Sequence, residues 1–118
     1  MSRKRVIKAL TSLGVTTKDI SIYVFLAREG PHETHSMAEA LEMSDQEIAN
    51  CLDVLERKGL VKKIGEIVPE RFFSVPFEKA VDLLVEANLK AVEIAEKSKK
   101  EALIFWDSML KENIEDNQ

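Results

Sequence analysis

Apolar residues recur every three or four positions through the first half of the chain, which is the spacing of one face of an α-helix. Glycines and a Gly-Pro pair interrupt this pattern, as expected at helix ends. The pattern therefore predicts four helices: residues 3–13, a second from Thr16 or Thr17 to Gly30, a short one within 34–43, and residues 44–58.

Capping residues mark the start of the last two helices. Ser36 with Glu39 has the spacing of a capping box, and Thr34 is the alternative start of the short helix. Ser44 is expected to cap the fourth helix, because its hydroxyl can accept from a backbone N–H of the first turn. Gly59 then ends that helix, since glycine readily adopts the left-handed conformation that follows a last turn.

Two short apolar runs, residues 60–64 and 71–75, predict the strands of a β-hairpin. Beyond Pro76 the chain has no Gly or Pro, and it predicts one helix of nearly forty residues, roughly 55 Å long. Its apolar residues follow steps of three and four, as in a coiled coil. The residues expected at this dimerisation seam are Val81, Leu84, Asn88, Ala91, Ala95, Ala102, Phe105, Trp106 and Met109.

This order of elements is that of a winged helix-turn-helix: a mainly α fold with a small β-hairpin and a long C-terminal dimerisation helix. We assign residues 1–75 to the winged helix-turn-helix domain and 76–118 to the long helix. A helix of that length has more apolar surface than a domain of this size can cover, so a second copy of the chain is the expected partner. Residues 44–58 are then the recognition helix for the major groove of DNA, and residues 60–75 are the wing that contacts the backbone.

Composition limits the function classes. The chain has 118 residues, a net charge of −4 and one Cys, so an internal disulfide is excluded. No secretory signal or membrane-spanning apolar run is evident, which favours a cytoplasmic protein and no membrane partner. We find no catalytic arrangement, phosphate loop or convincing metal motif, so neither an enzyme, a cofactor nor a metal is expected. His32 and His35 are interpreted as surface residues.

Charge is distributed unevenly, and this decides how DNA is contacted. Between residues 29 and 56 there is no Lys or Arg, whereas the flanks are basic, including Arg3, Lys4 and Arg5, which we expect to aid phosphate binding. Amide side chains can read adenine, and carboxylates can accept from cytosine N4. The candidate DNA-contacting residues are Ser44, Gln46, Glu47, Asn50, Arg57, Lys62, Lys63 and Arg71.

Three sequence features resemble the archaeal TrmB-like transcription regulators. They are Leu13-Gly14 before the second helix, the run 55–61 (LERKGLV), and the exit 73–76 (FSVP) into the long helix. The resemblance covers roughly residues 10–90 and implies a dimeric DNA-binding regulator of the short, single-domain type. The chain departs from the family's usual pattern in its acidic recognition helix and at Glu42, where the family usually has Gly.

Two other interpretations stay open. The acidic 29–56 surface is suited to docking a basic protein partner, which would make the chain a protein–protein interaction module. Alternatively, the chain is a sensor that holds a small-molecule effector between paired long helices near Phe105 and Trp106.

Overall fold

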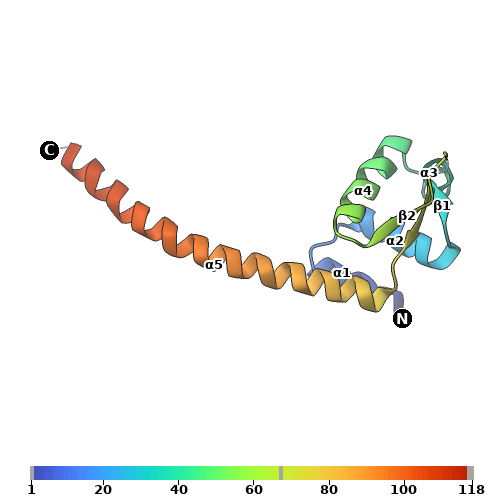
Figure 1. Ribbon diagram of the computed structural model, residues 1–118, viewed down its shortest axis with the longest axis horizontal. Coiled ribbons are helices and arrows are strands. Elements are labelled where there is room, and N and C mark those ends of the chain that lie inside the picture. The colour runs from blue at the N-terminus through green and yellow to red at the C-terminus, as the bar shows by residue number, and fades with distance from the viewer. Residues whose placement is uncertain (1, 67, 117–118) are drawn as a thin grey trace. The chain divides into compact units, whose positions relative to one another are not determined.

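The computed structural model describes residues 2–66 and 68–116 (Figure 1). The fold is mainly helical with a small antiparallel sheet, which confirms the predicted winged helix-turn-helix with a long C-terminal helix. The chain divides into two compact units, Met1–Val85 and the remainder from Glu86, and we call the first the winged-helix unit. The elements are α1 (Ser2–Ser12), α2 (Thr17–Glu29), β1 (His32–Glu33), α3 (Thr34–Leu41), α4 (Asp45–Arg57), β2 (Val61–Ile64), β3 (Arg71–Ser74) and α5 (Phe77–Asp116).

Most helix ends form where the sequence predicts them. Thr16 caps α2 by accepting from the Asp19 N–H at 3.3 Å. Gly59, with φ of 81°, follows the last turn of α4 in the left-handed region. Of the two starts that the sequence leaves open for the short helix, the structure has Thr34: α3 begins there, Ser36 lies inside the helix, and Glu33 at the N-cap position makes no side-chain cap. The preceding residues form strand β1, and this pairing fixes the backbone that leads into the helix.

The sheet has one strand more than the predicted hairpin. β2 and β3 form the hairpin, with Lys63 opposite Phe72, and β1 pairs with the other edge of β3, with His32 opposite Phe72. All neighbours are antiparallel, and the order is β1-β3-β2. A strand of two residues is too short to show the alternation of apolar and polar residues that predicts a strand. β1 is defined only by its pairing with β3, which lies some forty residues later in the sequence.

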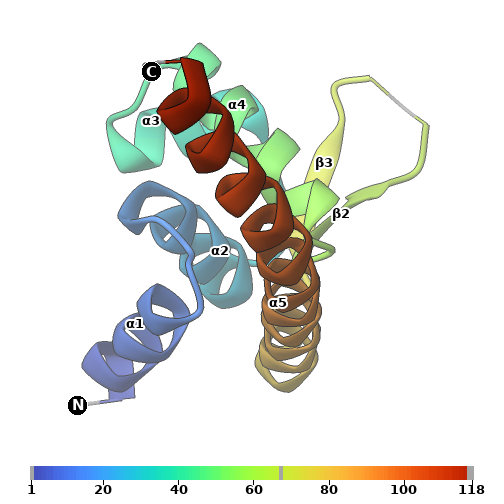
Figure 2. The same ribbon diagram turned by 90° about the vertical axis from the view of Figure 1, so that its left-hand side faces the viewer.

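Helix α2 lies at the centre of the winged-helix unit, with α1 on one side and the α3–α4 pair on the other (Figure 2). The Tyr23 hydroxyl donates to the Val75 carbonyl at 2.6 Å, which ties α2 to the end of the wing. Ala80 and Leu84, from the first turns of α5, are buried in the same core. The other core residues are Leu10, Val15, Ile20, Ile22, Tyr23, Leu26, Met37, Ala38, Ile48, Leu52, Leu55, Leu60, Val61, Phe72 and Val75.

The second unit consists of the remainder of α5. Every described side chain from Val85 to Glu112 is exposed, including the aromatic rings of Phe105 and Trp106. Over the residues that the structure describes, no helix combines the length and apolar character that a membrane span requires. In α5 the length is sufficient, but charged residues interrupt it throughout.

Candidate nucleic-acid interface

Helix α4 presents one apolar and one polar face. Ile48, Leu52 and Leu55 are at most 2% exposed and anchor the helix against α2 and α3. The opposite face is exposed and polar, and it includes Gln46 and Asn50. A short helix bracing a second one in this way is the geometry by which helix-turn-helix proteins present a helix to the major groove.

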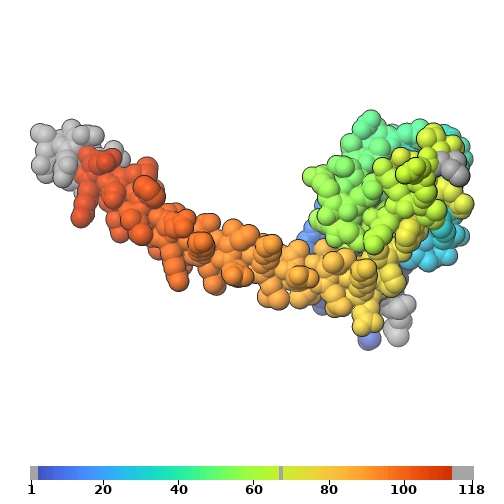
Figure 3. Space-filling view, viewed as in Figure 1, coloured from blue at the N-terminus to red at the C-terminus, as the bar shows by residue number. Residues whose placement is uncertain are grey.

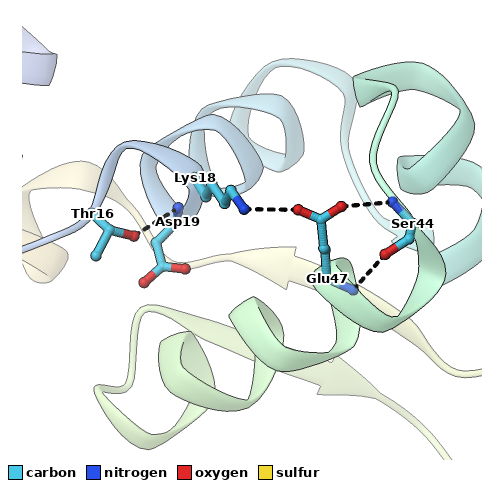
Figure 4. A network of polar contacts seen from close by, with 5 residues as sticks. All are labelled: Thr16, Lys18, Asp19, Ser44 and Glu47. Carbon is cyan, nitrogen blue, oxygen red and sulfur yellow. Dashed lines mark hydrogen bonds and ion pairs between the residues drawn. The ribbon is translucent and has the colours of Figure 1, made fainter.

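The N-terminus of α4 is held by a capping box (Figure 4). The Glu47 N–H donates to the Ser44 hydroxyl at 3.0 Å, and the Ser44 N–H donates to the Glu47 carboxylate at 3.3 Å. The same carboxylate pairs with Lys18 of α2 at 2.8 Å. The Lys18 hydrogen bond, together with the Ser44 backbone, lowers the pKa of Glu47, and Glu47 in turn raises the pKa of Lys18. Ser44 and Glu47 therefore already serve to cap and brace the helix.

Gln46 and Asn50 lie one turn apart on the exposed face and form a pair. The Gln46 Nε2 amide donates to Asn50 Oδ1 at 2.9 Å. This bond uses one of the two Gln46 N–H groups and leaves its carbonyl Oε1 as an acceptor. It likewise leaves the Asn50 amide nitrogen as a donor. The pair thus offers an acceptor and a donor side by side on the face of the helix.

Basic side chains at the end of α4 and on the wing have acidic neighbours. Arg57 pairs with Asp53 at 3.0 Å, and Lys63 pairs with Glu70 at 3.4 Å. Arg71 donates to the Pro31 carbonyl at 3.2 Å, and Lys62 is exposed. The surfaces of α4 and β2 meet on one face of the winged-helix unit (Figure 3). A groove of about 250 Å³ there is lined by Asp53, Glu56, Lys63 and Glu70, among other residues.

His35, in the first turn of α3, is exposed as the sequence analysis expects, but its two acidic partners were not predicted. Its Nδ1 lies 3.2 Å from Asp45 Oδ1, and its Nε2 lies 2.9 Å from Glu39 Oε1. The hydrogen bond and charge of Asp45, with the charge of Glu39, raise the pKa of His35 above its ordinary value of 6.5. Glu39 stands four residues after His35, which is a detectable spacing, but the pairing with Asp45 depends on how α3 and α4 pack.

Glu42 occupies the turn between α3 and α4 in a left-handed conformation, with φ of 54° and ψ of 46°. This is the position where the sequence departs from the glycine usual in the resembled family. The conformation costs a residue with a Cβ about 1 kcal/mol. The turn therefore forms here in spite of its side chain.

Helix α1 carries basic residues near its start. Arg3, Lys4 and Arg5 are exposed, but α2 lies between α1 and the α3–α4 pair (Figure 2). The sequence alone favours phosphate contacts by these residues in support of α4. Within the winged-helix unit, α1 lies on the other side of α2 from the α3–α4 pair.

Cys51 is half-buried on α4, and burial, followed by a hydrogen bond with Asp19, raises the pKa of its thiol to about 11. The thiol therefore stays protonated near neutral pH and is poorly reactive. Among residues 2–66 and 68–116, no group of three or more His, Cys, Asp or Glu side chains is placed to hold a metal ion.

The predicted seam of α5 divides between the two units. Leu84 is 4% exposed in the core of the winged-helix unit, which leaves it little surface for a partner, and Val81 is half-buried. The remaining seam residues are exposed: Asn88, Ala91, Ala95, Ala102, Phe105, Trp106 and Met109.

Comparison with known proteins gives one family match and several similar folds. The model of the family described as "Sugar-specific transcriptional regulator TrmB" matches residues 10–78. A possible transcriptional regulator from Methanosarcina mazei has a TM-score of 0.60 at 12% identity, over 86% of this chain and 88% of that chain. The ST1889 protein from Sulfolobus tokodaii has a TM-score of 0.57 at 23% identity, over 80% of this chain and 95% of that chain.

A mutant of S. aureus MepR bound to an oligodeoxyribonucleotide has a TM-score of 0.56 at 16% identity, over 92% of this chain and 87% of that chain. At these identities the structural matches show a shared fold. No curated protein sequence matches the chain.

Proposed function

Because the chain belongs to the TrmB family of transcriptional regulators and is not an enzyme, we propose that it binds double-stranded DNA as a homodimer. In this proposal α4 enters the major groove and the wing lies on the phosphate backbone. The observation that carries it is the exposed polar face of α4, capped at its N-terminus and braced by α3. A similar fold, that of S. aureus MepR, was solved with an oligodeoxyribonucleotide.

Gln46 and Asn50 are the residues proposed to form hydrogen bonds with the base edges. In the major groove adenine presents the N6 donor and the N7 acceptor. The acceptor on Gln46 and the donor on Asn50, adjacent because of their mutual hydrogen bond, match these two groups. We therefore expect each half-site to contain an A·T pair beneath the middle of α4. Glu47 has less freedom to read cytosine, because its carboxylate is engaged with Ser44 and Lys18.

Phosphate contacts fall to Arg57, Lys62, Lys63 and Arg71. Asp53 pairs with Arg57, and Glu70 pairs with Lys63. In the free protein these carboxylates therefore neutralise part of the positive charge of Arg57 and Lys63. The Asp53–Arg57 and Lys63–Glu70 pairs are exposed and cost little to break. The nearby carboxylates nevertheless repel the backbone, so we expect weak non-specific binding and a larger relative contribution from base contacts.

The homodimer is proposed from the exposure of α5. The helix has 40 residues, about 60 Å at 1.5 Å each, and apolar side chains recur along it beyond Val85. A second copy of α5 is the occupant we propose for this face, since it carries the same three-and-four spacing and so offers a matching seam. A two-fold pair would present two α4 helices to one duplex and would favour pseudo-palindromic sites.

The experiment is selection of bound sequences from random duplex DNA, followed by a salt titration of binding to the selected duplex. We expect selected half-sites with a recurrent A·T pair and a linear fall of log K with log salt. Lys63→Ala and Arg71→Ala should each reduce that slope by about 1 for every phosphate that the side chain neutralises. Lys97→Ala, on the exposed part of α5, is the matched control. No binding to mixed duplex at low salt would count against the proposal.

A second candidate is docking of a basic protein through the 29–56 surface. Exposed Glu39, Asp45 and Asp53, with no Lys or Arg in that segment, favour it. It predicts binding of a basic partner that weakens when Asp53 is replaced by Asn, whereas the same change should strengthen DNA binding.

A small-molecule effector held near Phe105 and Trp106 of paired α5 helices is a third candidate, favoured by the exposure of both rings.

A further inference from the structure

His35 has contacts that a neutral imidazole cannot satisfy. Both of its ring nitrogens lie within 3.2 Å of a carboxylate oxygen, one from Glu39 and one from Asp45. Carboxylates only accept hydrogen bonds, and a neutral ring has a single N–H. The geometry is therefore satisfied in full by the doubly protonated imidazolium, which donates in both directions.

The position of this group relates it to the proposed DNA face. His35 is in the first turn of α3, and Asp45 is the first residue of α4. In helix-turn-helix complexes the first helix crosses the phosphate backbone, while the N-terminal part of the second helix reaches the bases. The three side chains are each more than 60% exposed, so they remain accessible to a phosphate.

Protonation of His35 changes the net charge that this cluster presents to the phosphate backbone of DNA. With the ring neutral, Glu39 and Asp45 present two negative charges to the backbone; with the ring doubly protonated, the cluster carries one. Among the described residues, Asp45 of α4 and Glu39 of α3 are the charged groups that act on the ring. A phosphate brought near them would favour the charged ring further, because it adds negative charge beside it.

We propose that the doubly protonated form of His35 strengthens DNA binding by halving the negative charge that the His35, Glu39 and Asp45 cluster presents to the phosphate backbone, so that this protein binds DNA more tightly when His35 carries its second proton. The inference rests on the proposed DNA-binding function. It assigns to α3 a positive charge beside the phosphate backbone, in addition to the basic side chains of the wing, and it makes affinity for DNA fall as pH rises through the range in which His35 loses that proton.

The test is binding of the full chain to its selected duplex at constant ionic strength between pH 5.5 and pH 8.5. If DNA raises the pKa of His35 by half a unit to one unit, affinity should fall about three- to tenfold across its titration. His35→Gln should bind at every pH as weakly as the wild type does at high pH. His32→Gln is the control, since the chain has just these two histidines, and it should retain the pH dependence.

A direct readout is the NMR titration of the His35 Cε1–H signal in the free protein and in the complex. We expect a higher midpoint in the complex, and a lower midpoint in free Asp45→Asn than in the free wild type. DNA binding that does not change with pH, or a His35→Gln variant that keeps the dependence, overturns the inference and leaves the proposed function intact. No DNA binding at any pH overturns both.

Discussion

Lys18 at the start of α2 and Glu47 at the start of α4 are joined by an ion pair of 2.8 Å (Figure 4). The two residues are 29 positions apart, and the pair connects the central helix of the fold to the N-terminus of the candidate recognition helix. Because the Glu47 carboxylate also accepts from the Ser44 backbone, one side chain both caps α4 and orients it. The exposed face of α4 is therefore supported from two sides.

Ser44→Ala removes the side-chain half of the capping box. We expect a loss of about 1 kcal/mol in the free energy of unfolding, because the Glu47 N–H then lacks its intramolecular partner. Urea denaturation followed by circular dichroism measures it. Ser21→Ala is the control, since its hydroxyl donates to the Thr17 carbonyl within α2 and caps no helix. Equal losses in the two variants would contradict the assignment.

Glu47→Gln should destabilise the fold in a pH-dependent way. The pKa of Glu47 is lowered in the folded state, first by the Lys18 hydrogen bond, so its ionised form stabilises the fold. This contribution is complete above the unfolded value of about 4.5 and disappears as pH falls through the lower folded value.

The difference in unfolding free energy between wild type and Glu47→Gln should therefore be present at pH 7 and vanish well below pH 4.5. Glu101→Gln, on the exposed part of α5, is the matched control. A difference that stayed constant down to about pH 2 would show that the ion pair is not its source.

Glu42→Gly should raise the free energy of unfolding by up to about 1 kcal/mol. Glycine removes the Cβ that opposes φ of 54°, although the extra freedom it gives to the unfolded chain offsets part of the gain. Glu42→Ala removes the same charge and keeps the Cβ, so the Gly variant should be the more stable of the two. If Glu42→Ala were as stable as Glu42→Gly, the strain at this turn would be no larger than the unfolded-state entropy that glycine adds.

Tyr23→Phe should cost about 1–3 kcal/mol of unfolding free energy. The variant keeps the ring in the core but leaves the buried Val75 carbonyl without the hydroxyl that donates to it at 2.6 Å. Burial raises the pKa of Tyr23, so the hydroxyl keeps its proton at neutral pH. Thermal and urea denaturation measure the loss, and a value below about 0.5 kcal/mol would mean that water replaces the bond at little cost.

Phe105→Lys and Trp106→Lys should each weaken self-association about a hundredfold or more, if the proposed pairing of α5 is correct. Two copies of a large apolar side chain lose their burial, each worth about 1.5–3 kcal/mol. Ile104→Lys is the matched control, because residue 104 points away from the proposed seam on the helix. Analytical ultracentrifugation over micromolar concentrations gives the result, and a monomeric wild type would refute the pairing.

Local sequence is sufficient to predict most of the elements. The spacing of apolar residues indicates the helices of the winged-helix unit. Each helix buries one face, so its apolar residues recur every three or four positions within a few turns of sequence. Ser44, Gly59 and Pro76 stand at helix ends because capping and turn geometry depend on neighbouring residues alone. The left-handed conformation at Glu42 is also predictable, although only by resemblance to a family that usually has Gly there.

What the tertiary structure decided involves partners that are distant in sequence. Strand β1 exists because β3 approaches it, Leu84 is buried because α5 begins against the core, and His35 finds Asp45 because α3 packs on α4. Residue type alone shows that Glu47 and Gln46 are polar and suited to an exposed face. It does not show that Glu47 forms an ion pair with Lys18, or that Gln46 donates a hydrogen bond to Asn50. Ion pairs and amide pairs of this kind depend on ångström-scale distances, and only the packed helices set those distances.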